Sequence, residues 1–250
     1  MHTEKSVTHF LGVNFSNISE DDAISVISGL SQSESFNYIV TPNVDHVVML
    51  HDGKSDDVTA CFRGAYESAA LRLCDSRILQ LLAKIRGIEL EVVTGSDLTA
   101  RLFEHGLLDG KAVAIIGGDQ AMVPELMKRF PRVSLVQHIP PMGVLKNHQA
   151  IEDIEAFVVQ HLCDYVIFAI GAPQSEIIAR QCFEAGRAKG VAICVGASLE
   201  FILGRKARAP VWVQSVRSEW LFRMLCEPRR LWRRYLLTGP KIFRIVWKSR

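Results

Sequence analysis

The sequence of 250 residues lacks the cysteine spacing that is typical of a disulfide framework or a zinc site. Its six cysteines are scattered, and most lie in apolar runs, where a reduced cysteine behaves as a small hydrophobic residue. The histidines do not cluster either. His46 and His51 lie five positions apart on a predicted helix, which is poor spacing for two ligands of one metal ion. We therefore expect no metal site, and we expect the histidines to be surface or helix-flanking residues.

Long apolar runs are also missing. No stretch reaches the roughly 18 apolar residues that a membrane-spanning helix needs. The first 15 residues contain no apolar segment of the kind found in secretion signals, and there are no internal repeats or low-complexity segments. These absences predict a cytoplasmic protein, any membrane contact of which is peripheral.

Glycine-rich loops of fixed spacing are absent as well. Neither G-x-x-x-x-G-K-[ST] nor G-x-G-x-x-G occurs, and "IIGGDQA" supplies only two glycines and a small residue. Such glycines let a backbone approach a pyrophosphate or a sugar. They also make tight turns without any ligand. The residues alone leave both interpretations open.

What the sequence does contain is a regular alternation of short apolar runs and amphipathic segments. Helical periodicity is found in residues 19–30, where Ser19 is the expected N-cap, in 96–107, where Ser96 has that role, and in 148–162. Six runs read as strands that end at Gly, Pro, Asp, His or Ser: residues 36–42, 71–75, 111–118, 133–138, 164–173 and 190–198. This pattern predicts an α/β fold with a mostly parallel sheet covered by helices on both faces.

Ligands bind at the carboxyl ends of the strands in such sheets, so the residues that follow each strand are the candidates for a site. Thr41 and Asn43 follow the first run, and they either make a turn and a helix cap or line a pocket. Asp75 follows the second run. It either caps the helix predicted in residues 76–87 or serves as a general base that takes a proton from an acceptor hydroxyl.

Charge is distributed unevenly along the chain. The segment from Arg205 to Arg250 holds 13 of the 29 basic residues but only two of the 27 acidic ones. The alternation of strands and helices also stops near Gly204. We therefore expect a body in residues 1–204 and a basic helical appendage in residues 205–250, which would meet an anionic surface or partner.

Residues 229–236 form the clearest part of this appendage. At 100° per residue, four arginines face one side, and Leu231, Trp232, Tyr235 and Leu236 face the other. Such a helix binds nucleic acid, lies on anionic lipid, or docks on the acidic body and covers its active site. Nucleic acid is the least favoured partner, because the coherent apolar face suits an interface.

These segments together resemble one enzyme family. The resemblance runs from about Val40 to Phe243 and includes "TPNVDHV", Asp75 after the next strand, "VTGSDLTARLFE", "VAIIGG", "PPMG", "IGAPQSE" and "VGASLEFILGRKARAP". The C-terminal "SEWLFRMLCEPRRLWRRYL" is the most specific part. On these motifs the sequence is identified as a member of the WecG/TagA/CpsF glycosyltransferase family, glycosyltransferase family 26.

The resemblance implies an inverting, metal-independent glycosyltransferase without a cofactor, built on a Rossmann-like body. It implies a UDP-sugar donor of hexose type and a polyprenyl-diphosphate-linked glycan acceptor, used in exopolysaccharide or other surface-glycan synthesis. The enzyme would work on the inner face of the cytoplasmic membrane, with its appendage on the anionic lipid surface. Asp75 matches the general base, and Thr41 and Asn43 match pocket residues beside it. Further substrate-binding positions implied by the motifs are Gly117, Gly143, Gly171, Pro173, Gln174, Glu176, Arg223, Arg230 and Arg233 or Arg234.

The sequence departs from the family pattern around the implied donor pocket. Ser76 stands where the family has glycine, and Ser175 stands within the usual Pro-Lys-Gln-Glu stretch. These departures bear on the sugar that is bound. They also leave room for an alternative, a non-catalytic module that binds a UDP-sugar or lipid carrier and assists another transferase.

Overall fold

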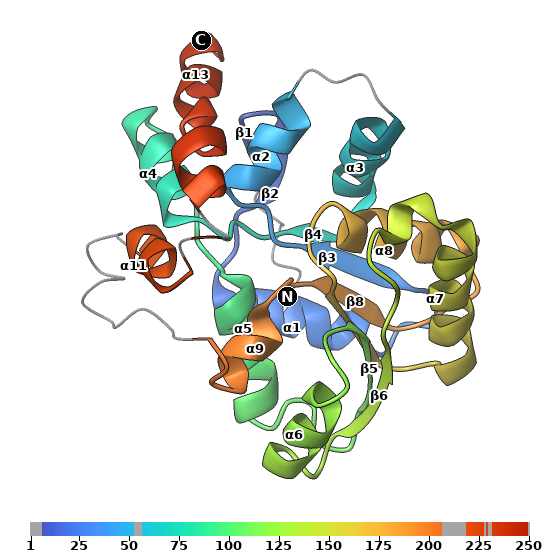
Figure 1. The fold of residues 1–250 in the computed structure, drawn as a ribbon. Helices are drawn as coiled ribbons and strands as arrows, with labels where there is room; N and C mark the ends of the chain where they lie inside the picture. Colours follow the sequence, from blue (N-terminus) through green and yellow to red (C-terminus); the bar gives the residue numbers. More distant parts are fainter. Residues whose placement is uncertain (1–6, 53–56, 207–218, 228, 230–231, 250) are drawn as a thin grey trace.

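The computed structural model describes residues 7–52, 57–206, 219–227, 229 and 232–249 (Figure 1). Within them, six strands form one parallel sheet in the order β4-β3-β8-β7-β5-β6. The strands are β3 (Asn37–Val40), β4 (Leu71–Arg72), β5 (Ala112–Gly117), β6 (Ser134–His138), β7 (Tyr165–Ala169) and β8 (Val191–Cys194). Each predicted strand segment contains one of them, so the predicted Rossmann-like α/β fold is confirmed.

Helices cover both faces of the sheet because the strands are apolar on both faces. Tyr38 and Val40 of β3 face one apolar core, and Ile39 between them faces the other. Helices of the first core are α2 (Val44–His51), α3 (Asp57–Ser68), α4 (Arg77–Ile85), α7 (His148–His161), α8 (Gln174–Ala185) and α13 (Lys241–Lys248). Helices of the second core are α1 (Glu20–Leu30), α5 (Gly95–Glu104), α6 (Met122–Arg129) and α9 (Ser198–Ile202).

A hairpin that the sequence analysis did not predict precedes the sheet. Its strands β1 (Val7–Phe10) and β2 (Val13–Ser16) pair antiparallel around Leu11 and Gly12, both with positive φ, as a type I′ hairpin turn requires. Arg72 ties this hairpin to β4. Its Nε donates to the Asn14 carbonyl at 2.6 Å, and its backbone N–H donates to Ser16 Oγ at 3.1 Å.

Two expected helix caps had different outcomes. Ser19 caps α1, since its Oγ accepts from the Asp22 N–H at 3.2 Å, as predicted. The expected cap at Ser96 is wrong. Thr94 holds that position, because its Oγ1 accepts from the Asp97 N–H at 3.0 Å and the helix begins at Gly95.

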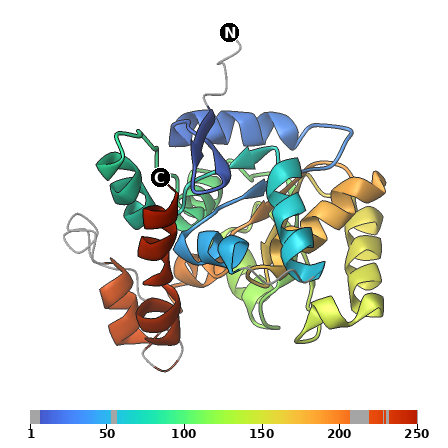
Figure 2. The same cartoon turned by 90° about the horizontal axis from the view of Figure 1, so that it is seen from above.

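The C-terminal segments lie against the body. Ile242 of α13 is buried in the first core, and α13 packs against α2 (Figure 2). Lys241 forms an ion pair with Asp52 at 2.8 Å. Arg205 pairs with Asp119 at 2.8 Å and with Glu125 at 2.9 Å. The proposed boundary at residue 204 is therefore bridged by both apolar packing and ion pairs.

The predicted amphipathic helix takes a different form. After α11 (Glu219–Cys226), residues Arg233–Thr238 form a π-helical segment, η2. The other short helix, η1 (Val144–Lys146), is a 3₁₀ helix in the body. A π-helix advances by more residues per turn than an α-helix, so faces assigned at 100° per residue do not hold from Arg233 onward. Trp232 and Leu236 are exposed. In the part of the chain that is described, no helix is both long and apolar enough to span a bilayer.

Candidate active site

The carboxyl ends of β3 and β4 bring two predicted site segments into contact. The backbone N–H of Asp75 donates to the Pro42 carbonyl at 2.9 Å, which fixes Asp75 beside the turn formed by Thr41 and Asn43. All six strands of the parallel sheet end at this same edge. Asp75 therefore lies at the edge where α/β sheets bind their ligands.

Thr41 and Asn43 both have structural tasks there. The Thr41 side chain is buried, and its hydroxyl donates to the Cys194 carbonyl at 2.8 Å, which joins the ends of β3 and β8. Asn43 caps α2, because its Oδ1 accepts from the N–H groups of Asp45 and His46. The cap uses only the amide oxygen of Asn43, so its Nδ2 donors are not needed for it.

Asp75 does not cap the helix that follows it. Ser76 has that role, since its Oγ accepts from the Leu79 N–H at 3.2 Å at the start of α4. The backbone of Ser76 is extended, with φ of −161°, and any residue adopts that conformation. Serine at this position is therefore unstrained. The carboxylate of Asp75 is half-buried, and it is not needed to begin α4.

Unsatisfied hydrogen-bonding groups gather where β7 leads into α8. Gln174 Oε1, Ser175 Oγ and Glu176 Oε2 are buried without a hydrogen-bond partner among the described residues. The Ser175 and Glu176 side chains are only 1% and 2% exposed. Buried polar atoms are almost always paired in folded proteins, so three in a row mark a place where a ligand or ordered water supplies partners.

The glycines at the other strand ends differ in their surroundings. Gly117 has φ of +106°, and a Cβ there would lie 2.6 Å from Ile170 Cγ2, so close packing between β5 and β7 requires glycine. Gly143 and Gly171 also have positive φ, but a Cβ on either would meet open space. Gly171 stands two residues before Pro173, at the turn into α8. These two turns are accessible to a ligand in a way that Gly117 is not.

A buried polar cluster that the sequence analysis missed lies behind this edge. His46 Nδ1 is 2.7 Å from the Tyr66 hydroxyl, and the rings of both pack against Phe62. The expectation that His46 is a surface or helix-flanking residue is wrong. Its burial lowers its pKa to about 4, so the imidazole is neutral near pH 7. The sequence signal was weak, because a histidine on an apolar helix face indicates burial but not a partner.

Burial also changes the protonation of Glu176. Desolvation raises its pKa to about 7, and no basic side chain contributes to that shift. Desolvation likewise raises the pKa of the Tyr66 phenol well above its ordinary value, and the carboxyl groups of Glu176 and Asp75 raise it further. The imidazole of His46 and the phenol of Tyr66 are therefore both neutral near pH 7.

The predicted diphosphate ligands are arginines of the appendage. Arg230 and the side chains of Arg223, Arg233 and Arg234 lie outside the described residues. Two nearby segments can be placed, since α13 and η2 both contact α2, the helix that Asn43 caps. Figure 2 shows α13 alongside α2.

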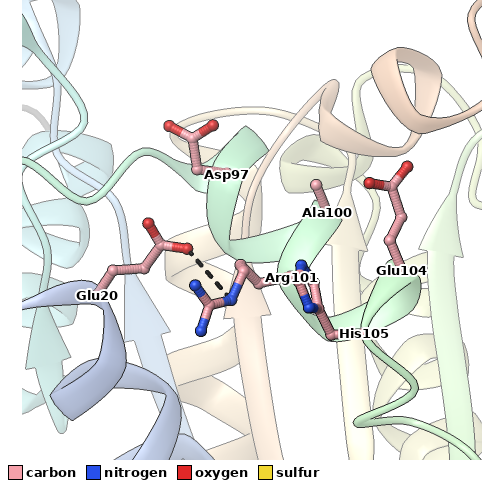
Figure 3. Close-up of a pocket in the computed structure, with 6 residues that line it drawn as sticks. All are labelled: Glu20, Asp97, Ala100, Arg101, Glu104 and His105. Carbon is pink, nitrogen blue, oxygen red and sulfur yellow. Dashed lines mark ion pairs between the residues drawn. The ribbon is translucent and has the colours of Figure 1, made fainter.

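A separate hollow lies on α5 near α1 (Figure 3). Arg101 stands in it and pairs with Asp21 at 2.7 Å and with Glu20 at 3.9 Å, so its charge is already matched. Over the described ranges, no group of three or more His, Cys, Asp or Glu side chains is arranged to hold a metal ion. We assign no ligand to this hollow.

The chain is similar to known glycosyltransferases. The chain is 26% identical over 195 residues to the N-acetylglucosaminyldiphosphoundecaprenol N-acetyl-beta-D-mannosaminyltransferase of Bacillus spizizenii, a match that covers 75% of this chain and 72% of that relative. The family described as "Glycosyl transferase WecG/TagA/CpsF family" matches residues 8–250. The chain therefore belongs to the WecG/TagA/CpsF family and is a glycosyltransferase.

Proposed function

We propose that this glycosyltransferase moves a hexose-type sugar from a UDP-sugar to a polyprenyl-diphosphate-linked glycan, with inversion and without a metal ion, in surface-glycan synthesis. The observation that carries the proposal is the position of Asp75, fixed at the carboxyl edge of the sheet by its bond to the Pro42 carbonyl. The relative from Bacillus spizizenii supports the acceptor class, since its name specifies a sugar on a diphosphoundecaprenol carrier.

Asp75 is the general base in this proposal. Its carboxylate would take the proton from the acceptor hydroxyl as that oxygen attacks the anomeric carbon and UDP leaves. Its backbone is anchored at the carboxyl edge of the sheet, and Ser76 rather than Asp75 caps the helix that follows. Asn43 lies beside it, and its Nδ2 would orient a substrate oxygen.

The donor would lie across the other strand ends. The open turns at Gly143 and Gly171 would allow a ligand to approach the backbone. Gln174, at the N-terminus of α8, has an oxygen without a partner among the described residues, which would accept from a sugar hydroxyl. The partial positive charge at that helix end favours the diphosphate of the donor. Thr41, Gly117, Pro173 and Glu176 would shape this pocket from behind.

The appendage would complete the site and bring it to the membrane. Arg223, Arg230 and Arg233 or Arg234 would stabilise the diphosphate as UDP leaves. On α13, Phe243 and Trp247 are exposed one helical turn apart. With nearby basic residues, these aromatic side chains suit the inner face of an anionic cytoplasmic membrane.

Substitution of Asp75 tests the proposal. Release of UDP would be measured with a panel of UDP-sugars and a short-chain prenyl-diphosphate-linked N-acetylglucosamine acceptor. Asp75→Asn should lower kcat at least about 100-fold on the active donor, because the amide cannot accept the proton. Asp109→Asn is the matched control, since Asp109 pairs with Arg132 and precedes β5, at the opposite edge of the sheet.

Two results would count against the proposal. Wild-type turnover by Asp75→Asn would remove this residue from the mechanism. Binding of a UDP-sugar without turnover, with every donor and acceptor tried, would favour the non-catalytic module instead.

A further inference from the structure

Two helices that are far apart in the sequence meet on one side of the molecule. The Arg86 side chain, at the end of α4, donates through Nη2 to the Val246 carbonyl in the last turn of α13. Figures 1 and 2 both show α4 and α13 side by side. Ile85 and Trp247 are the chain neighbours of the two bonded residues, so both lie close to this junction.

The outward face of α4 carries both apolar and basic side chains. Leu82 is buried in the first core, whereas Leu81 and Ile85 are 37% and 70% exposed. Their spacing of four residues places them on one face of the helix. At 100° per residue, the exposed Arg77 and Lys84 fall on the same face. Single exposed apolar residues are normal on a soluble protein, but a pair at helical spacing forms a stripe.

The outer face of α13 continues this stripe across the junction. Phe243 and Trp247 are exposed one helical turn apart, while Ile245 and Val246 pack against the first core. The two helices thus present four large apolar side chains around the hydrogen bond that joins them. A contiguous exposed patch of this kind marks an interaction surface.

The charges of the two helices indicate what this surface binds. Residues 77–86 and 241–248 contain no acidic residue and six basic ones, which are Arg77, Lys84, Arg86, Lys241, Arg244 and Lys248. Cations among exposed aliphatic and aromatic side chains match an anionic bilayer, where the cations meet lipid phosphates and the apolar groups reach the acyl boundary. A second copy of the chain fits less well, because a twofold interface would bring two basic faces together.

We propose that α4 and α13 form one membrane-binding surface, the α4/α13 surface. In it, Leu81 and Ile85 of the body enter the headgroup region of an anionic bilayer beside Phe243 and Trp247 of the appendage. This inference rests on the membrane contact in the proposed function and extends that contact from the appendage to the body. The body therefore binds the membrane through a helix of its own.

The position of α4 connects this surface to the reaction. The helix starts directly after Asp75 and Ser76. Because an α-helix rises about 1.5 Å per residue, Ile85 stands about 14 Å from Ser76 along the helix. A contact through α13 alone would let the body rotate about one helix, whereas contacts through both helices fix its orientation. Docking would thus hold Asp75 near the headgroup layer, where the diphosphate of a lipid-linked acceptor lies.

Substitutions on α4 test the surface in the full chain. Binding is measured by co-sedimentation with vesicles of equal parts phosphatidylcholine and phosphatidylglycerol. Leu81→Ser combined with Ile85→Ser should weaken binding at least about tenfold, because two apolar side chains no longer enter the bilayer. Lys84→Gln leaves the apolar stripe intact and should weaken binding about fivefold. That second loss should disappear on vesicles of phosphatidylcholine alone.

Matched controls come from the other side of the sheet. Leu107→Ser combined with Met127→Ser removes two exposed apolar side chains, one after α5 and one on α6, both helices of the second core. Lys128→Gln removes an exposed charge from α6. These variants should bind the vesicles as the wild type does. Thermal unfolding at the wild-type temperature shows that each variant keeps its fold.

Three results would overturn the inference, and they differ in what else they affect. Wild-type vesicle binding by the Leu81 and Ile85 variant, with binding lost on substitution of Phe243 and Trp247, would leave the contact to α13 alone. Wild-type binding by both variants would also remove the membrane contact from the proposed function. Self-association of the wild type that is lost in the Leu81 and Ile85 variant, without a change in vesicle binding, would assign this face to a second copy.

UDP release on a water-soluble acceptor is measured separately, because it reports on the transfer and not on the membrane. The absence of turnover by the wild type with every donor would contradict the proposed transfer. Weaker vesicle binding by the Leu81 and Ile85 variant, with wild-type turnover on the soluble acceptor, is the result expected for the α4/α13 surface.

Discussion

Individual buried residues make the stability of this protein depend on pH at both ends of the range. The pKa of His46 is lowered from 6.5 to about 4, so the unfolded chain binds a proton before the folded one does. The free energy of unfolding therefore falls as pH drops from about 6.5 through 4. Glu176 acts in the opposite direction, since its pKa is raised from 4.5 to about 7. Its contribution is fully present below pH 4.5 and is lost as pH rises through 7.

Glu176→Gln should change this pH dependence. At pH 8 the Glu176 carboxyl group ionises freely in the unfolded chain but not when it is buried in the fold, which lowers the free energy of unfolding of the wild type. The variant has no ionisable group at this position and avoids this loss. The stability of the variant relative to the wild type should therefore rise between pH 4.5 and pH 8, by on the order of 3 kcal/mol. Urea unfolding at both pH values measures the difference. Parallel curves for the two proteins would mean that Glu176 keeps an ordinary pKa in the folded state.

His46, Tyr66 and Glu176 also show why part of the site could not be predicted. Each lies on a helix segment whose apolar spacing indicates a buried face, but the three come from different helices. Their meeting depends on how α2, α3 and α8 pack on one sheet face, and that packing is tertiary. The strand-end residues Asn43 and Asp75 were predictable for the opposite reason. Parallel strands bring their carboxyl ends to one edge whatever the helices do.

Local signals predicted whole elements better than their ends. The six sheet strands are continuous apolar runs bounded by turn residues, and this pattern identified all of them. The hairpin of β1 and β2 was missed because its turn is Leu11-Gly12, which lacks the usual Asn-Gly or Asp-Gly signal. The cap of α5 was misplaced because Thr94 and Ser96 both carry hydroxyls, which lie 3.0 Å apart. Only the three-residue spacing from Thr94 to Asp97 decides between them.

The cap of α4 offers a test at the level of one element. Ser76→Ala removes the hydroxyl that accepts from the Leu79 N–H and should lower the free energy of unfolding by about 1 kcal/mol. Ser76→Gly should lower the free energy of unfolding by only a few tenths of a kcal/mol, because glycine is tolerated at helix N-caps. Denaturant unfolding measures both. A larger loss in the glycine variant than in the alanine variant would show that the hydroxyl is not what matters there.

At the scale of the whole molecule, the uneven charge of the sequence is partly matched within the fold. Of the basic residues after Gly204, Arg205 pairs with Asp119 and Glu125, and Lys241 pairs with Asp52. These pairs are exposed and contribute little energy individually. They do give the appendage a fixed direction, because they join its two ends to the body. Docking on the acidic body is therefore compatible with the proposed contact with anionic lipid, since different residues would carry out each task.

Within its eight residues, α13 has one face that is buried against the body and another that is exposed. Ile242 is 1% exposed and packs into the first core, whereas Phe243 and Trp247 are 62% and 69% exposed on another face of α13. Exposed aromatic side chains on a basic helix are suited to the lipid headgroup region. The inner face of α13 thus anchors the helix, and the exposed aromatic side chains on its outer face carry the proposed membrane contact.

Substitution of Phe243 and Trp247 by serine should therefore abolish binding to vesicles that contain phosphatidylglycerol, because the apolar contact with the bilayer is lost. Turnover on a water-soluble, short-chain acceptor should remain at the wild-type level, since neither side chain is buried in the fold. Ile242→Ala is the contrasting variant. It should cost about 2–5 kcal/mol of stability through the cavity it leaves. Vesicle co-sedimentation and UDP release measure the two properties separately. If the doubly substituted variant still sediments with the vesicles, the membrane contact lies on another surface. If it loses turnover on the soluble acceptor, the outer face of α13 belongs to the active site.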